Sequence, residues 1–189
     1  PSIMSVFLGD TLTKIFESMV SSGDYVHAAR QTLDLGTRQL ADIFKDNTDR
    51  NRTSPFAFTG NKFEFRACGS SASIGYPLSI LNACIVDIFE ETNKIIETEL
   101  AKGKTSDEAL AAVILKWYSN AQAVVFNGDG YSAEWVKEAA KRGLGNLRTT
   151  PEAIAVLKDA KKTNVLLKTG VFRESEISTR HNVMLERYI

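Results

Sequence analysis

The longest uninterrupted pattern in the 189-residue chain begins at Pro77 and continues to about Leu100. Apolar side chains recur there every three or four residues, which is the spacing of one face of a helix. Gly103 follows the pattern, as glycine often does just after a helix C-terminus. A helix of this length needs other elements to cover its apolar stripe. The pattern therefore predicts a packed, mainly α-helical, bundle-like domain.

Four later helices are predicted from the residues at their N-termini. They are a helix from the Thr105–Glu108 capping box to about Trp117, one capped by Ser132 that continues to Lys141, one capped by Thr150 ahead of Pro151 that reaches about Asp159, and one capped by Ser175 that continues into Tyr188. Near the N-terminus, a short extended segment at Met4–Leu8 precedes a helix that ends at residues 21–23. Residues 25–44 are ambiguous, with a short strand within 31–36 or one or two helical turns within 37–44.

Residues 55–67 interrupt this helical pattern with two short predicted strands, joined by a turn at Thr59-Gly60-Asn61. On the second strand Lys62, Glu64 and Arg66 alternate with phenylalanines. Residues two apart in a strand share a face, so the three charges are neighbours and the rings are expected to face a core.

Two interpretations of the charged face remain open. It can be a solvated surface on which Glu64 pairs with the flanking cations. It can also be a binding site, in which Glu64 holds a divalent cation and the basic side chains bind phosphate or carboxylate groups. The alternation by itself favours the solvated surface, and three features strengthen the case for a binding site: Arg52 just upstream, the glycine turn, and the cluster of Asn, Thr and Ser residues before the strands.

Composition excludes several other functions. The 23 basic and 23 acidic residues balance, so a broad surface for nucleic acid or anionic membrane is not expected. No apolar run approaches the roughly 20 residues of a membrane span. Cys68 and Cys84 form no CxxC pair, which favours a reducing compartment and a cytoplasmic location. His27 and His181 form no ligand motif and are expected to be structural, and the Asn-Gly and Asp-Gly pairs of residues 126–131 indicate a turn rather than a calcium loop.

The segment "NRTSPFAFTGNKFEFR" resembles the signature of the long, type III glutamine synthetases and the "NRS…RIE.R" region of the shorter ones. The resemblance continues through "LNACIVDIFEE", "VVFNGDGYSAEWVKEAAKRGL", "TTPEA" and "MLERY". It implies ATP-dependent ligation of ammonia to glutamate through γ-glutamyl phosphate, with Mg²⁺ or Mn²⁺ ions and a ring-shaped homo-oligomer. It also implies that the strand pair belongs to the catalytic sheet of a larger α+β enzyme.

The resemblance assigns a role to each of four residues. Glu64 would coordinate the nucleotide-side metal ion, and Arg66 would bind the carboxylate of the substrate glutamate. Lys62, where shorter enzymes usually have arginine, would contact the nucleotide phosphates. Arg52 would stabilise the phosphoryl group during transfer. The second arginine that shorter enzymes carry a few residues after the "NR" has no counterpart in residues 55–57.

The resemblance further predicts one mostly helical segment of a longer chain, in which residues 1–50 are a helical insertion, 51–75 the active-site strands and 76–189 a helical region. In the family pattern the other metal ligands, the adenine pocket and the glutamate flap lie upstream of Pro1, so the isolated segment is expected to be inactive. Two alternatives remain: a non-catalytic helical interaction or regulatory module, and a related γ-glutamyl ligase that uses another amine.

Overall fold

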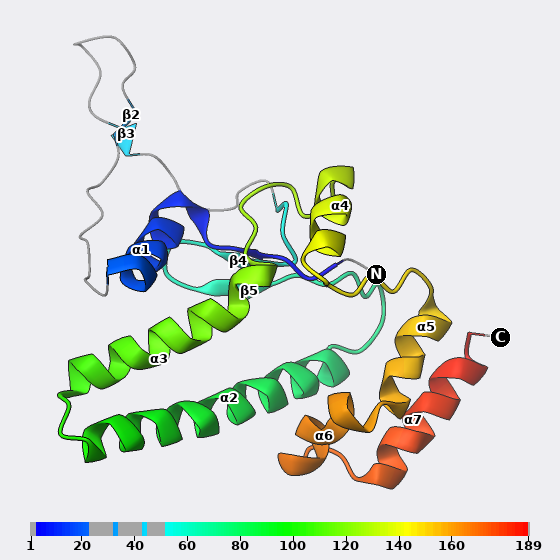
Figure 1. Cartoon of the computed structure of the whole chain (residues 1–189). Helices are drawn as coiled ribbons and strands as arrows, with labels where there is room; N and C mark the ends of the chain where they lie inside the picture. The colour runs from blue at the N-terminus through cyan, green and yellow to red at the C-terminus, as the bar shows by residue number, and fades with distance from the viewer. Residues whose placement is uncertain (1–2, 23–31, 34–42, 45–51, 189) are drawn as a thin grey trace. The chain divides into compact units, whose positions relative to one another are not determined.

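The computed structural model describes residues 3–22, 32–33, 43–44 and 52–188 (Figure 1). Most of them are helical, which confirms the predicted mainly α-helical fold with a short strand pair. The helices are α1 (Gly9–Ser22), α2 (Gly75–Ala101), α3 (Ser106–Ala121), α4 (Ala133–Lys141), α5 (Thr150–Ala155), α6 (Ala160–Lys168) and α7 (Glu174–Glu186), with 3-10 turns at Gln122–Val124 and Val156–Lys158. The strands are β1 (Val6–Phe7), β2 (Thr32–Leu33), β3 (Ile43–Phe44), β4 (Phe56–Phe58) and β5 (Phe63–Phe65).

The chain divides into two compact units whose segments alternate along the sequence. One, called here the helical unit, combines residues 68–113 and 146–188. The other, called here the sheet unit, combines the described residues up to 67 with residues 114–145. All four residues predicted to form a site belong to the sheet unit. The site can therefore be described within one unit.

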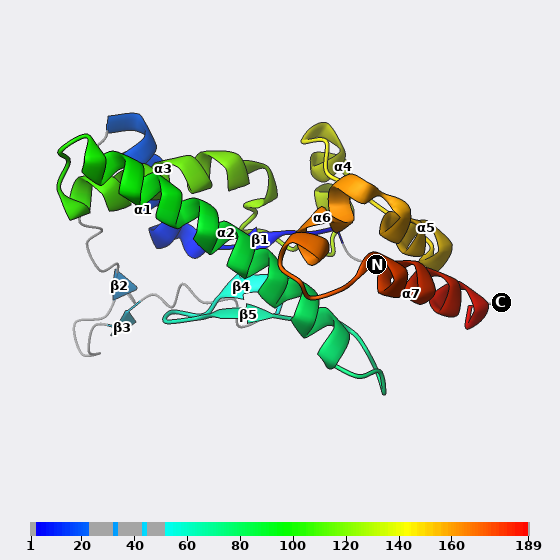
Figure 2. The same ribbon diagram turned by 90° about the horizontal axis from the view of Figure 1, so that it is seen from below.

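The sheet unit is organised around three short strands in the order β1-β4-β5 (Figure 2). The β4–β5 hairpin is antiparallel, as predicted, and places Ala57 opposite Glu64. β1 lies parallel to the other edge of β4, with Phe7 opposite Ala57. A further parallel bridge joins Val6 to Val125, and the backbone N–H of Phe126 donates to the Val6 carbonyl. The predicted extended segment at the N-terminus is thus confirmed as β1, the edge strand beside β4.

Trp135 on α4 is the centre of the core of the sheet unit. It is fully buried with Ile3 and Ala139, and its ring stacks on Phe126 with 4.4 Å between centroids. The Arg142 guanidinium lies 5.3 Å from the centroid of the indole ring. An aromatic ring that contacts both another ring and a cation gains stacking and cation–π energy in addition to its burial. Helix α4 is consequently tied to the segment that borders β1.

In the helical unit, α2 packs against α6 and the segment that follows it. Ala83, Leu166, Phe172 and Ile177 form the buried cluster. Lys168 pairs with two carboxylates of α2, and hydrogen bonding to Asp87 and then Glu90 raises the pKa of its ammonium. Ala83 is the one α2 residue that is fully buried within the described chain. Large apolar side chains of α2 remain exposed: Leu78, Ile85, Val86, Ile88, Phe89 and Leu100.

Three predicted helix ends are confirmed, the first being the Ser132 cap of α4, whose hydroxyl accepts the Trp135 N–H. Gly103 adopts a φ of +84° and closes α2 with a Schellman motif, in which Gly103 N–H donates to the Leu100 carbonyl and Lys104 N–H to the Glu99 carbonyl. Thr105 and Glu108 exchange the hydrogen bonds of a capping box at the start of α3. Each of these contacts joins residues three to five positions apart, which is why the sequence pattern locates them.

Other predicted helix starts are wrong by one or two positions. The cap of α5 is Thr149 rather than Thr150, because Glu152 stands three residues after Thr149 and completes a capping box with it. Ser175 lies inside α7, which begins at Glu174. The N-cap of α7 is Arg173, whose backbone N–H donates to the Glu176 carboxylate at 2.7 Å. The sequence pattern missed α6, whose N-cap is Asp159.

Most of the predicted helical insertion over residues 1–50 lies outside the described residues, and so does His27. The part that is described contains α1 and an antiparallel pairing of β2 with β3. The strand predicted within residues 31–36 is confirmed at Thr32–Leu33. Ile43–Phe44 is a strand, so the helical turns predicted there are wrong at these two residues, because pairing with β2 overrides local propensity.

The remaining sequence expectations concern single residues. His181 is buried in α7, with its Nδ1 3.0 Å from Asn182 Oδ1, which fits the expected structural role. Cys68 and Cys84 are exposed and unpaired. Among the described residues, no helix combines the length and apolar character that crossing a membrane requires.

Candidate active site

The turn of the β4–β5 hairpin determines where the charged strand begins. Gly60 adopts a φ of +96°, a conformation that glycine allows without steric cost. The Thr59 backbone N–H donates to the Lys62 carbonyl at 2.8 Å, and its hydroxyl donates to the same oxygen at 3.2 Å. β5 therefore starts directly after Lys62, which lies beside the turn, and carries Glu64 at its middle.

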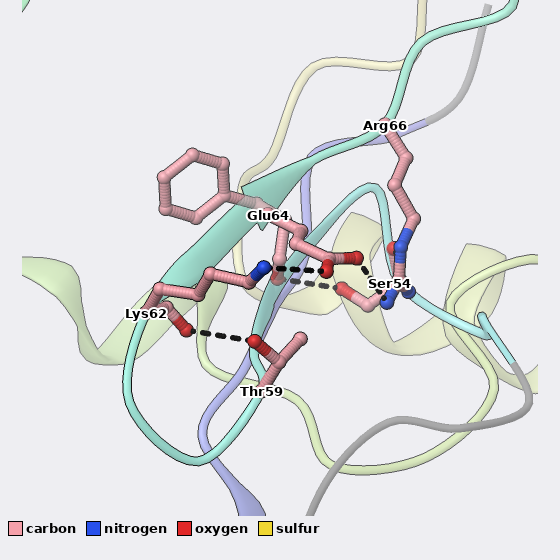
Figure 3. A network of polar contacts seen from close by, with 6 residues as sticks. Ser54, Thr59, Lys62, Glu64 and Arg66 are labelled. Atoms are coloured by element: carbon pink, nitrogen blue, oxygen red, sulfur yellow. Dashed lines mark hydrogen bonds and ion pairs between the residues drawn. The ribbon is translucent and has the colours of Figure 1, made fainter.

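Lys62, Glu64 and Arg66 lie together, as the alternation predicted (Figure 3). Glu64 is central, with Oε1 3.8 Å from Lys62 Nζ and Oε2 3.2 Å from Arg66 Nη2. Exposure decreases along the strand, from 65% of the Lys62 side chain through 41% of Glu64 to 19% of Arg66. Pairs this exposed contribute on the order of 0–1 kcal/mol to stability, so the fold does not depend on them.

Arg66 is the best fixed of the three charged residues. Its Nη1 donates to the Ser54 carbonyl at 3.3 Å, and its backbone N–H donates to the Pro55 carbonyl at 2.7 Å. A planar guanidinium held on one side by Glu64 and on another by a backbone carbonyl has a defined orientation. The guanidinium of Arg66 is therefore the most firmly oriented cation on the charged face.

Arg52 lies two residues before Ser54, so its backbone adjoins the segment that holds Arg66. It is exposed and has a φ of +54°, which is unusual for a residue other than glycine. No contact joins its guanidinium to the ion-paired group within the described chain. The structure thus brings three of the four predicted residues into contact and places the fourth at the adjoining turn.

The opposite face of the hairpin differs from expectation. Its phenylalanine rings were expected to be covered by a core, yet Phe63 is 46% and Phe65 40% exposed. Within the described residues the rings pack on one another, with Phe56 5.6 Å from Phe63 and Phe58 5.3 Å from Phe63. On the charged face, in contrast, Ala57 is fully buried beside Glu64. A strand pattern identifies two faces, but neighbouring chain segments decide which of them is covered.

Glu64 was predicted to bind a divalent cation, and the residues around it fit that role only in part. A hard cation prefers six or more oxygen ligands, including several carboxylates for Ca²⁺ and one or two for Mg²⁺. No group of three or more His, Cys, Asp or Glu side chains able to hold a metal ion occurs in the described part of the chain. Glu64 can thus furnish one carboxylate ligand, but within the described residues it does not belong to a group of three such side chains.

The sequence pattern missed the residues that support this site. The "NGDG" loop, identified as a simple turn, is a clamp in the structure. Asn127 Oδ1 accepts the backbone N–H groups of Leu8 and Gly9 at 3.1 and 3.0 Å, and its Nδ2 donates to Thr13 Oγ1 at 2.9 Å. Gly130 N–H donates to the Thr53 carbonyl at 2.7 Å. The only feature of the loop that the sequence pattern could use is its two glycines, which indicate a turn but not the distant residues that the loop binds.

A separate cavity of about 240 Å³ lies in the helical unit. Its lining comes from the 3-10 turn after α5, from α6 and from α7, and none of the four predicted site residues contributes to it. The lining is mixed, with apolar side chains beside Lys158, Glu174 and His181. The hairpin thus remains the candidate active site.

Comparison with known proteins supports the resemblance seen in the sequence. Residues 109–189 match the family described as the glutamine synthetase C-terminal domain. Over its whole length the chain is 38% identical to a glutamine synthetase of Bacteroides fragilis (strain YCH46) and 36% identical to a type-3 glutamine synthetase of Dictyostelium discoideum. A glutamine synthetase of Butyrivibrio fibrisolvens is also 36% identical over the whole chain.

The chain spans about a quarter of the length of these relatives, covering 26%, 25% and 26% of them respectively. The match includes the charged hairpin, the clamp loop and the C-terminal helices, because the similarity extends over the whole chain. The chain therefore belongs to the glutamine synthetase family, and its similarity to the type 3 class is continuous from end to end.

Proposed function

We propose that this chain is part of an ATP-dependent glutamate–ammonia ligase and provides one wall of its phosphoryl-transfer site. The observation that carries the proposal is the grouping of Lys62, Glu64 and Arg66 on one strand, with Arg52 at the adjoining turn. Phosphoryl transfer needs little covalent help from a protein, but it needs fixed charges around the transferring group. A carboxylate flanked by oriented cations meets that need.

The proposed roles follow from how firmly each side chain is held. Arg66, which is mostly covered and anchored at two points, would bind the carboxylate of glutamate as a planar partner. Lys62, the most exposed of the group, would follow the nucleotide phosphates as a mobile point charge. Arg52 would reach the phosphoryl group as charge develops during transfer.

Glu64 would hold a Mg²⁺ or Mn²⁺ ion, which when bound would neutralise phosphate oxygens of ATP. In the structure both carboxylate oxygens of Glu64 face cationic groups. Of these two pairs, the one with Lys62 is the longer and more exposed, so Lys62 would be the freer of the two cations to contact the nucleotide phosphates.

Substitutions in the full-length protein test the proposal. Glu64→Gln keeps the shape but removes the charge, and we expect at least a tenfold lower rate of ammonia-dependent ADP release, partly restored by high Mn²⁺. Arg66→Lys keeps the charge but loses the planar fork, and we expect the KM for glutamate to rise at least tenfold. Glu134→Gln, an exposed change of the same kind on α4, serves as control. Folded, fully active Glu64→Gln and Arg66→Lys variants would refute the assignment.

Two other functions are distinguished by the same assays. A non-catalytic interaction module is favoured by the exposed apolar side chains of α2, and it predicts that the Glu64 and Arg66 variants keep full ligase activity. A related γ-glutamyl ligase predicts loss of activity in these variants together with a preference for an amine other than ammonia. A panel of amines offered to the full-length enzyme separates the second case from ammonia ligation.

A further inference from the structure

A buried pair of serines lies directly behind the candidate active site. Ser5 and Ser54 are both fully buried, although 49 residues separate them, and their hydroxyl oxygens are 3.1 Å apart. The Ser54 hydroxyl lies 2.9 Å from the Ser5 carbonyl and 3.0 Å from the Phe56 carbonyl. A hydroxyl has one proton, so Ser54 donates to one carbonyl while it can accept from Ser5. The pair ties β1 to the turn before β4.

Gly130 locks the same turn from a third chain segment. Its N–H donates to the Thr53 carbonyl, and a side chain at this position would clash with Ser5 Oγ and lie 2.9 Å from the Thr53 carbonyl oxygen. Glycine is required here by lack of space, since three backbone segments meet at this point. Thr53 and Ser54 are thus held from two sides.

The two residues held in this way connect the proposed catalytic arginines. Arg52 precedes them directly and has the left-handed φ of +54°. Arg66 donates to the carbonyl of Ser54. A non-glycine residue keeps a left-handed backbone only where its surroundings fix it, and such residues gather at functional sites. The serine pair and Gly130 supply that constraint.

We propose that Ser5, Ser54 and Gly130 are positioning residues that hold Arg52 and Arg66 in register with each other. This inference rests on the proposed ligase function. The three residues touch no substrate; they act through the backbone of residues 53 and 54. A shift of about 1 Å in a positioned group can cost on the order of a hundredfold in rate. Loosening this support should therefore change both kcat, through Arg52, and the KM for glutamate, through Arg66.

The first test is Ser54→Ala in the full-length enzyme, with kcat and the KM for glutamate and for ATP measured separately. We expect kcat to fall about 10- to 100-fold and the glutamate KM to rise about tenfold, with a smaller change in the ATP KM. Ser5→Ala should be milder, about two- to fivefold, because the Ser5 carbonyl still accepts from Ser54. Thr149→Ala removes the N-cap of α5 in the helical unit and controls for a simple loss of stability.

A second, paired test addresses Gly130. Gly130→Ala should lower kcat at least tenfold, and adding Ser5→Ala should restore part of it, because the substitution removes one of the two oxygens that crowd the new methyl group. Wild-type kinetic constants in Ser54→Ala, or a double variant no better than Gly130→Ala, would overturn the inference. Glu64→Gln and Arg66→Lys, assayed in parallel, separate the ligase function from the positioning role. If these two variants are fully active, the proposed ligase function fails. If they are impaired but the Ser54 and Gly130 variants are not, only the positioning role fails.

Discussion

Asn127 provides the sharpest test of how the sheet unit is held together, and the relevant change is Asn127→Ala. The substitution removes three hydrogen bonds: two from the backbone at the start of α1 and one to Thr13 Oγ1. Hydrogen bonds of this kind contribute about 0.5–1.5 kcal/mol each, and losing a helix cap costs about 0.5–2 kcal/mol. The combined loss is about 2–3 kcal/mol for any opening that separates α1 from the loop.

Hydrogen exchange measures this opening directly. Each 1.4 kcal/mol corresponds to a factor of ten, so exchange of the α1 amides that open with this separation should be about 30- to 150-fold faster in Asn127→Ala. Asn127→Asp keeps the acceptor and places a negative charge at the helix N-terminus, so it should lose about 1 kcal/mol or less. Asn120→Ala, an exposed change on α3, should leave the exchange of α1 unchanged.

The outcome that refutes this account is specific. If exchange across Gly9–Ser22 changes less than threefold in Asn127→Ala, the side chain does not hold α1. If Asn127→Asp is as fast as Asn127→Ala, the donor to Thr13 matters and the capping acceptor does not. The first result would mean that α1 is held mainly by its apolar face, and the second that the hydrogen bond to Thr13 holds it.

Two further predictions concern ion pairs outside the site. Hydrogen bonding from Lys102, and then from Lys104, lowers the pKa of Glu99 to about 2. The contribution of the Glu99 carboxylate to stability is therefore complete above its ordinary pKa near 4.5 and is lost as the pH falls toward 2. The difference in thermal midpoint between wild type and Glu99→Gln should accordingly shrink over that pH range, and a constant difference would contradict this prediction. Arg142→Lys keeps the charge, but a lysine cannot bind Glu138 and two backbone carbonyls at once while covering Trp135. We therefore expect the free energy of unfolding in urea to fall by about 1–2 kcal/mol and the tryptophan emission to shift. An unchanged urea midpoint would contradict this role of Arg142.

The candidate site was predictable from the sequence in its chemistry but not in its support. The alternation of charge and aromatic residues was enough to place Lys62, Glu64 and Arg66 side by side, because side chains two apart on a strand share a face. Their proposed roles depend on the family resemblance, since the same alternation also fits a solvated surface. Neither source pointed to Ser54 or Gly130, whose partners lie 49 and 77 residues away along the chain.

The sequence alone determined those parts of the local structure that depend on residues close together in the chain. The glycine turn of the hairpin and the end of α2 rest on hydrogen bonds between residues at most five positions apart, which residue type and spacing encode. Only the tertiary structure decided that β1 pairs with β4, that Asn127 caps α1, and that the Phe63 and Phe65 rings of the hairpin stay partly exposed. Such contacts join segments 50 to 120 residues apart, and whether they form depends on how the whole chain packs, which no short window of sequence contains.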